Sequence, residues 1–255
     1  MTTLDLTPAP GAAPFARMVA AQAGAEVRAS LRNGEQLLLT LVIPVLLLVG
    51  FSLAPLVDTG AGSRVDFLAP GVLALAVMST AFTGQAIATG FERRYGVLKR
   101  LGATPLSRPG LMLAKTAAVI AIEALQVAVI ALVALALGWH PHGSPLGVLL
   151  LVLLGTAAFS GLGLLMAGTL RAEATLAAAN LVYLVLLGLG GVIFPLAKFP
   201  AGMRSVLELL PISALTGGLR SVLQAGAGVP LGAVAVLAVW AVVGLGLASR
   251  FFRWE

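Results

Sequence analysis

Residues 111–137, LMLAKTAAVIAIEALQVAVIALVALAL, contain two charged side chains in a run long enough to cross a lipid bilayer as a helix. The hydrocarbon core of a bilayer is about 30 Å thick and takes about 20 helical residues per crossing. Membrane barrels are built from shorter segments of alternating hydrophobicity. Five further apolar stretches of comparable length lie at 36–57, 67–89, 145–169, 176–197 and 230–252. The sequence therefore predicts an all-α integral membrane protein with six transmembrane helices.

The composition excludes a soluble protein. Of the 255 residues, 59% are hydrophobic and 10% are charged, whereas soluble domains average about 45–50% and about 25%. The chain has no cysteine, which excludes disulfides and thiolate metal sites. Its net charge of +6 is typical of basic cytoplasmic loops in membrane proteins, so we expect no nucleic-acid partner.

The distribution of basic residues predicts the orientation, because cytoplasmic segments are enriched in lysine and arginine. With the N-terminus inside, eleven basic residues fall in cytoplasmic segments and four in outer segments. The cytoplasmic set is Arg17, Arg28, Arg32, Arg93, Arg94, Lys99, Arg100, Arg108, Arg171, Arg250 and Arg253, and the outer set is Arg64, Lys198, Arg204 and Arg220. We expect both chain ends in the cytoplasm, and a multi-pass protein of the cell (inner or plasma) membrane.

Residues 1–35 are predicted to be a cytoplasmic N-terminus that precedes a transmembrane domain at 36–255. Apolar residues recur here at every fourth position, with polar residues between them. These residues are Phe15, Val19, Ala23, Val27 and Leu31. The spacing predicts an amphipathic helix along the cytoplasmic membrane surface. The alternative is a frayed basic tail, which would not be expected to keep the four-residue spacing.

The segment FERRYGVLKRLGATPLSR at 91–108, between the second and third crossings, is also amphipathic. Phe91, Tyr95, Leu98 and Leu101 are spaced as one helical face, which predicts a short cytoplasmic helix at 91–106. The remaining surface of this helix is charged and carries Glu92, Arg93, Arg94, Lys99 and Arg100. Basic residues that only fixed the topology would not need the apolar face, so we expect the helix to contact a cytosolic partner.

Proline and serine mark the end of that segment. Thr104 and Pro105 are expected to end the helix, because the residue before a proline avoids the helical region. Ser107 is placed to cap the third crossing by accepting a hydrogen bond from a backbone N–H group.

The outer segment at 198–229 is too apolar for a solvated loop, yet prolines and glycines divide it into pieces too short to span. In lipid, backbone groups need internal partners. We therefore expect two short re-entrant helices, at 201–210 and 213–223, that form a cap over the outer mouth of the protein.

Polar residues inside the membrane have two possible meanings. Lys115 lies near the cytoplasmic end of the third crossing, from which its side chain can extend to the headgroups. Glu123 lies about 21 Å into the same crossing, at a depth where a carboxylate costs a few kcal/mol. Either Glu123 lines the path of a cationic or polar substrate together with Gln126 and Gln85, or it is hydrogen-bonded for structural reasons to Gln126, Gln85 or Thr83.

Several kinds of chemistry are absent from the sequence. It contains no GxxxxGK[ST] phosphate-binding loop, no HExxH and no GxSxG. We predict no catalytic residue, no metal site and no cofactor on this chain, which is therefore not an enzyme. It is interpreted as a conduit or scaffold whose energy comes from a gradient or from another subunit.

The segment at 91–108, preceded by Asp66-Phe67-Leu68-Ala69-Pro70-Gly71, resembles the permease subunits of the ABC-2 family of transporters. The likeness is greatest to drug-resistance permeases of the daunorubicin type. Those permeases carry a Glu-Arg pair, a glycine, spaced leucines and a Thr-Pro-x-Ser-Arg run between their second and third helices. The matching residues are Glu92-Arg93, Gly96, Leu98, Leu101 and Thr104-Pro105-Leu106-Ser107-Arg108.

A second resemblance covers the end of the fifth crossing and the outer segment. The matching residues are Gly191-Val192-Ile193-Phe194-Pro195, Pro200, Pro211 and Arg220. One residue departs from the pattern, since Leu210 stands where the family often has asparagine.

The resemblance implies a pair of permeases, the second being another copy or a paralogue, with one ATPase subunit beneath each. ATP and Mg²⁺ would bind those two partner ATPases. Tyr95, Leu98 and Leu101 would anchor a coupling helix whose charged residues, Glu92, Arg93, Arg94, Lys99 and Arg100, face the ATPase. The expected function is bacterial export of an amphipathic substrate: a drug, a lipid or a lipid-linked glycan.

Two other functions compete with this expectation. A proton-driven carrier would use Glu123 as its proton site and would work without an ATPase. A membrane scaffold would bind partners without moving a solute. The amphipathic basic segment favours the permease, because a proton carrier has no need of a docking surface.

Overall fold

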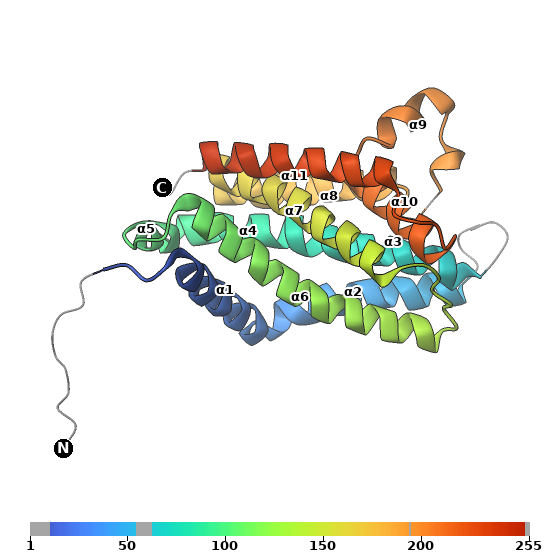
Figure 1. The fold of residues 1–255 in the computed structure, drawn as a ribbon, viewed down its shortest axis with the longest axis horizontal. Helices are drawn as coiled ribbons and strands as arrows, with labels where there is room; N and C mark the ends of the chain where they lie inside the picture. The colour runs from blue at the N-terminus through green and yellow to red at the C-terminus, as the bar shows by residue number, and fades with distance from the viewer. Residues whose placement is uncertain (1–10, 55–62, 194, 253–255) are drawn as a thin grey trace, which may run out of the picture.

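The computed structural model describes residues 11–54, 63–193 and 195–252, and the described residues form helices joined by short turns (Figure 1). The longer elements are α1 (Phe15–Arg32), α2 (Gly34–Leu53), α3 (Arg64–Met78), α4 (Gln85–Arg94), α6 (Arg108–Ala136), α7 (Pro145–Thr169), α8 (Ala172–Leu189), α10 (Pro211–Leu223) and α11 (Leu231–Phe251). The shorter ones are the π-helix η1 (Ser79–Gly84), α5 (Val97–Gly102), the 3₁₀ turn η2 (Leu196–Lys198) and α9 (Ala201–Leu207). No strand occurs within the described ranges, so the predicted all-α class is confirmed.

Five helices are long and apolar enough to cross a membrane: Arg64–Arg94, which joins α3, η1 and α4, together with α6, α7, α8 and α11. These are five of the six predicted crossings. The first predicted crossing corresponds to α2, within which the apolar part described is Thr40–Leu53. The apolar pair of α9 and α10 is a further candidate for a membrane crossing, although its two helices meet at 92°.

The helix Arg64–Arg94 forms the centre of the bundle. Of the residues in its most apolar stretch, 83% are buried inside the protein, whereas the corresponding share is 22% for α8 and for α11. It can be apolar on all sides because α2, α6, α7 and α10 pack around it. The exposed leucines and valines of the outer helices are the surface expected of a protein whose solvent is lipid.

Helices α7 and α11 pack backbone against backbone. A Cβ atom added to Gly161 would lie 2.5 Å from the backbone nitrogen of Leu245, and one added to Gly244 would lie 3.2 Å from the carbonyl carbon of Gly161. Glycines at a crossing let two membrane helices approach closely. This pair forms the most extensive helix contact among the described residues.

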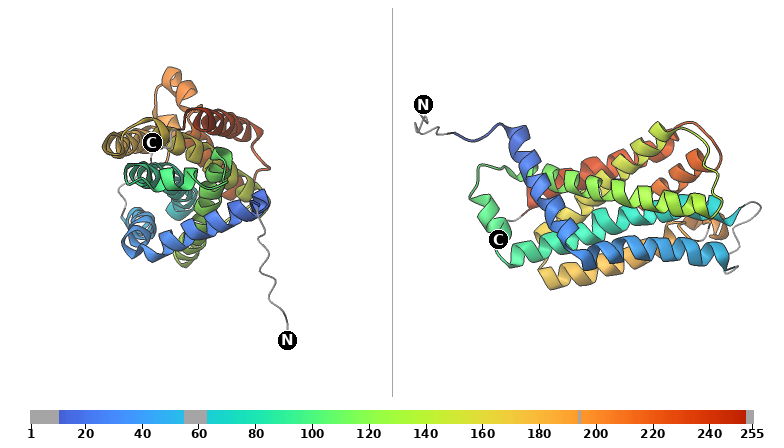
Figure 2. Two further views of the ribbon diagram at one scale, coloured as in Figure 1. Left: turned by 90° about the vertical axis from the view of Figure 1, so that its left-hand side faces the viewer. Right: turned by 90° about the horizontal axis from the view of Figure 1, so that it is seen from below.

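The two ends of the bundle differ. Helices α1 and α5 lie at one end, and α9 and α10 lie at the other (Figures 1 and 2). Helix α1 runs obliquely across its end and packs against α6. The predicted apolar spacing in α1 is partly confirmed, because Val19 is buried whereas Phe15 and Leu31 are about half exposed.

The two outer helices are α9 and α10, close to the predicted 201–210 and 213–223. Helix α9 is largely exposed, but α10 is buried against α3, α7 and α11. Helix α10 therefore belongs to the packed body of the protein, and a surface cap describes only α9.

Candidate functional site

The chain turns sharply where the sequence predicts one helix at 91–106. Gly96 has a φ of 72°, a left-handed conformation that favours glycine. It divides the segment, so that Phe91–Arg94 ends α4 and a separate helix, α5, follows at Val97–Gly102. The continuous apolar spacing concealed this break.

Helix α5 is anchored by leucines. Leu98 is fully buried in a cluster with Leu106, Leu111 and Met112, and Leu101 packs against the same cluster. Tyr95 was expected to be a third anchor, but its side chain is 67% exposed. It lies beyond the end of α4, where it can touch a partner instead.

The end of α5 follows the sequence prediction. The Thr104 hydroxyl donates to the Leu101 carbonyl oxygen at 2.6 Å, and the helix ends at Gly102, before Pro105. Ser107 is confirmed as the N-cap of α6, since its hydroxyl oxygen accepts from the Gly110 N–H group at 3.3 Å. The result is a short, fixed turn of helix at one end of the bundle.

The charges of the segment 91–106 divide into an outward and an inward group. Lys99 and Arg100 on α5 are exposed. The two arginines of α4 instead contact the turn between α7 and α8 and the start of α8: Arg93 donates to the carbonyl oxygen of Leu170, the C-cap residue of α7, and Arg94 pairs with Glu173 of α8.

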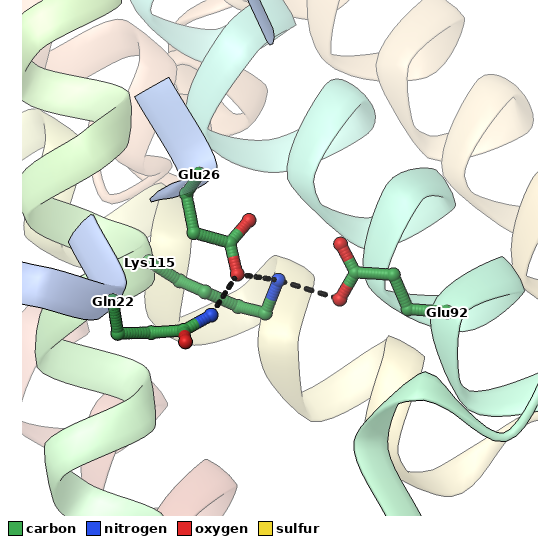
Figure 3. A network of polar contacts seen from close by, with 4 residues as sticks. All are labelled: Gln22, Glu26, Glu92 and Lys115. Carbon is green, nitrogen blue, oxygen red and sulfur yellow. Dashed lines mark hydrogen bonds and ion pairs between the residues drawn. The ribbon is translucent and has the colours of Figure 1, made fainter. Parts of the chain in front are cut away.

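Glu92 faces inward, contrary to the expectation that it faces a partner. Figure 3 shows Lys115 of α6 between Glu92 of α4 and Glu26 of α1. Lys115 Nζ lies 2.6 Å from Glu92 Oε2 and 2.9 Å from Glu26 Oε1, to which Gln22 Nε2 also donates at 2.9 Å. We call these four residues the Lys115 junction.

Lys115 was expected to extend to the headgroups, but its side chain is 4% exposed. The two carboxylates accept the hydrogen bonds that water would have accepted at the membrane surface. The buried ammonium group is therefore paired. The junction joins α1, α4 and α6. Sequence reasoning missed Glu26 and Gln22, although their i, i+4 spacing beside the apolar stripe of α1 was a usable signal.

The intramembrane residues Glu123, Gln126 and Gln85 do not form one site. Gln126 Oε1 accepts from Thr80 at 2.9 Å, and Gln126 Nε2 donates to the Thr40 carbonyl oxygen at 3.0 Å. Glu123 points away from them and accepts a hydrogen bond from Thr156 of α7. The predicted partners of Glu123, which were Gln126, Gln85 and Thr83, are therefore wrong.

Glu123 lies at an otherwise apolar groove of about 320 Å³ between α6 and α7. The walls carry Val127, Val148, Val152 and Leu153. No second titratable side chain lines this groove among the described residues.

Arg220 of α10 is the central residue at the opposite end. Its guanidinium donates to three carbonyl oxygens, at 2.6 Å to Gly191, 2.7 Å to Val192 and 3.2 Å to Phe67. It also lies over the Phe67 ring, 3.7 Å from the centroid. Gly71 makes room, because a Cβ atom there would lie 2.7 Å from the Val192 oxygen. We call this set the Arg220 clamp.

The prolines of the outer segment sit at helix starts. Pro200 is the N-cap residue of α9, Pro211 is the first residue of α10, and Pro195 precedes η2. Phe194, which the sequence also singled out, lies outside the described residues.

A polar notch of about 170 Å³ opens between α2, η1 and α8. Its polar lining consists of Thr40, Ser79, Thr83, Asn180 and Tyr183. The neighbouring surface of α2 and α8 is apolar, with Ile43, Leu181, Leu184 and Val185 exposed. Polar groups in such a surface mark a contact with protein or with a water-filled path.

One family model matches most of the chain. The model for ABC-2 type transporter matches residues 20–224, from within α1 to just beyond α10. No curated protein matches the chain.

Proposed function

This chain belongs to the ABC-2 type transporter family and is the membrane-spanning permease component of an ABC transporter; on that premise we propose that it works in an exporter driven by separate ATPase subunits. The family implies an ABC ATPase partner. Two such subunits, carrying ATP and Mg²⁺, would serve a pair of permeases in the cell membrane. The observation that carries the proposal is α5, a short helix anchored by apolar residues with basic residues on its outer side.

Helix α5 has the properties of a docking element. Leu98 is fully buried, so a force on α5 is passed to the cluster that it shares with α6. Lys99 and Arg100 are exposed, and so is Tyr95, which precedes α5. We propose that these three residues contact the ATPase, in the role of a coupling helix. Glu92 and Arg93 would act from behind this surface, by holding α4 in place.

The test is assembly with an ATPase. The chain would be purified in nanodiscs with the candidate ATPase subunit encoded beside it, and complex formation and ATP turnover would be measured. Changing Lys99 and Arg100 to Glu should weaken the complex about tenfold, which corresponds to about 1.4 kcal/mol. The matched control changes two exposed arginines of α1, Arg17 and Arg28, to Glu and should bind normally. Equal binding by both variants, or loss only in the α1 variant, would exclude α5 as the docking surface.

The polar notch supports a location for the second permease and the substrate path. Asn180 is exposed, and its amide would be costly to leave against lipid. A second permease facing α2 and α8 would cover it. The substrate would then pass between the two copies, with apolar walls for its hydrophobic part and the notch for its polar part.

The absence of cysteine makes this arrangement simple to test. Asn180→Cys should form a disulfide-linked dimer in the membrane. Val243→Cys, at an exposed position of α11, should remain monomeric under the same oxidation. Crosslinking through Val243 in place of Asn180 would move the interface to α11.

An amphipathic substrate and outward transport complete the proposal. The leucine- and valine-rich walls suit a drug, a lipid or a lipid-linked glycan, and export is proposed from the resemblance to drug-resistance permeases of bacteria. A proton carrier centred on Glu123 gains no support from the geometry, because the groove that Glu123 lines is otherwise apolar.

A further inference from the structure

The Lys115 junction contains one more negative than positive charge. Lys115 Nζ contacts Glu26 and Glu92, so two carboxylates share a single ammonium group. These three side chains carry one net negative charge, and Glu26 and Glu92 are 18% and 25% exposed.

The neighbouring basic residues are directed elsewhere. On α1, Arg28 is exposed. On α4, Arg93 donates to the Leu170 carbonyl oxygen at the end of α7, and Arg94 pairs with Glu173 of α8.

A cavity of about 70 Å³ adjoins the junction. Glu26, Ser30 and Lys115 line one part of it, and residues of α2, η1, α4 and α6 line the remainder. One water needs about 10–15 Å³ of such space. The cavity therefore has room for a small hydrated ion.

Two side chains of the cavity wall have buried polar atoms without partners. Gln85 is 6% exposed, and neither its amide nitrogen nor its amide oxygen has a hydrogen-bond partner among the described residues. Thr89 is fully buried, and its hydroxyl is also unpartnered. Native proteins rarely leave such groups unsatisfied. The π-helix η1 ends immediately before Gln85, and π-helical turns occur frequently at functional sites.

We propose that this cavity binds one hydrated monovalent cation of the alkali-metal class, held by the Glu26 carboxylate, the Gln85 amide oxygen and the Thr89 hydroxyl. Hard cations prefer oxygen ligands, which this wall supplies. A single charge balances the junction, whereas a divalent ion would overcompensate it. The ion would join α1 to α4 at the point where Lys115 already joins both to α6. This inference concerns the chain itself and does not depend on the identity of the ATPase or the substrate.

The test measures stability of the full chain in nanodiscs made of uncharged lipids. Thermal unfolding would be followed by tryptophan fluorescence at pH 7 while NaCl or KCl replaces N-methyl-D-glucamine chloride at constant ionic strength. A bound cation stabilises the state that binds it. The unfolding midpoint should rise by several degrees and saturate.

Two variants locate the ion. Gln85→Leu leaves the three charges of the junction intact and should remove the saturable rise. Glu26→Gln should also remove it, and this variant should still fold because Lys115 keeps Glu92. The matched control is Glu123→Gln, which changes a buried carboxylate outside the cavity and should keep the full rise.

Two outcomes would overturn the proposal. The first is an unfolding midpoint that is the same in sodium, in potassium and in N-methyl-D-glucamine. If that midpoint changes with pH alone, the balancing charge is a proton and not a metal ion. The second is a saturable rise that persists in both Gln85→Leu and Glu26→Gln.

Discussion

The Lys115 junction and the Arg220 clamp solve the same problem in opposite ways at opposite ends of the bundle. Each surrounds a cationic side chain with oxygen atoms from segments that are far apart in the sequence. Lys115 meets two carboxylates on side chains. Arg220 meets three backbone carbonyls and an aromatic ring, with no carboxylate among its described contacts.

The chemical difference implies a mechanical one. The guanidinium of Arg220 is a planar fork whose donors are directed at fixed backbone atoms, so it holds α3, α10 and the end of α8 in one arrangement. The ammonium of Lys115 is a point charge on a flexible stem, and its partners are flexible as well. Helices α1, α4 and α6 can therefore shift while their pairing persists. The adaptable end is the one that carries α5.

The largest effect is expected at the clamp. Arg220→Met should lower the free energy of unfolding by about 3–5 kcal/mol, because three carbonyl oxygens lose charge-assisted hydrogen bonds. Thermal unfolding in nanodiscs would measure the loss. Arg204→Met is the matched control, since the Arg204 pair with Glu208 is exposed on α9, and it should change stability by less than about 1 kcal/mol. Similar results for the two variants would show that Arg220 is not a clamp.

A somewhat smaller loss is expected at the junction. Lys115→Met should cost about 2–4 kcal/mol, because two carboxylates remain together without a cation and can escape part of this cost by binding protons. Adding Glu26→Gln and Glu92→Gln to the same chain should recover most of the loss in the same unfolding assay. A triple variant as unstable as Lys115→Met would mean that the lysine stem, and not its charge, matters.

The close packing beside the clamp provides the next test. Gly71→Ala should cost about 1–3 kcal/mol by overpacking, since the new methyl group would meet the Val192 oxygen at 2.7 Å and Arg220 Nη2 at 3.0 Å. A Cβ atom added to Gly50 of α2 would have nothing within 4 Å, so Gly50→Ala should be neutral or stabilising by up to about 1 kcal/mol. If Gly71→Ala leaves the free energy of unfolding unchanged, the clamp end is as adaptable as the junction.

The smallest effect sharpens the comparison. Glu26→Gln removes one of two carboxylates and leaves a one-to-one pair between Lys115 and Glu92, so the loss should stay below about 1 kcal/mol. Unfolding midpoints at zero sodium, where the proposed ion does not contribute, would measure it. A loss equal to that of Lys115→Met would mean that the junction is as rigidly determined as the clamp.

The crossings were predictable because hydropathy is a property of consecutive residues. The apolar runs correspond to the helices of the bundle, and the Ser107 cap and the two short outer helices follow from local sequence in the same way. The break at Gly96 was harder to predict, since glycine permits a left-handed turn without requiring one.

The polar sites depend on contacts that local sequence does not contain. Glu26 lies 89 residues from Lys115, and Glu123 lies 33 residues from Thr156. Spacing within α6 placed Gln126 near Glu123, but the two side chains face different neighbouring helices. The sequence therefore predicted which polar residues needed partners, and the packing of the helices decided which partners they have.

The contact between Gly161 and Gly244 has a consequence for how this protein is made. The ribosome releases α7 before α8, α9, α10 and α11, so the glycine face of α7 enters the membrane without the helix that will cover it. Until α11 arrives, that face must be occupied by lipid or by an insertion factor that shields membrane segments. Closure of the bundle thus waits for α11.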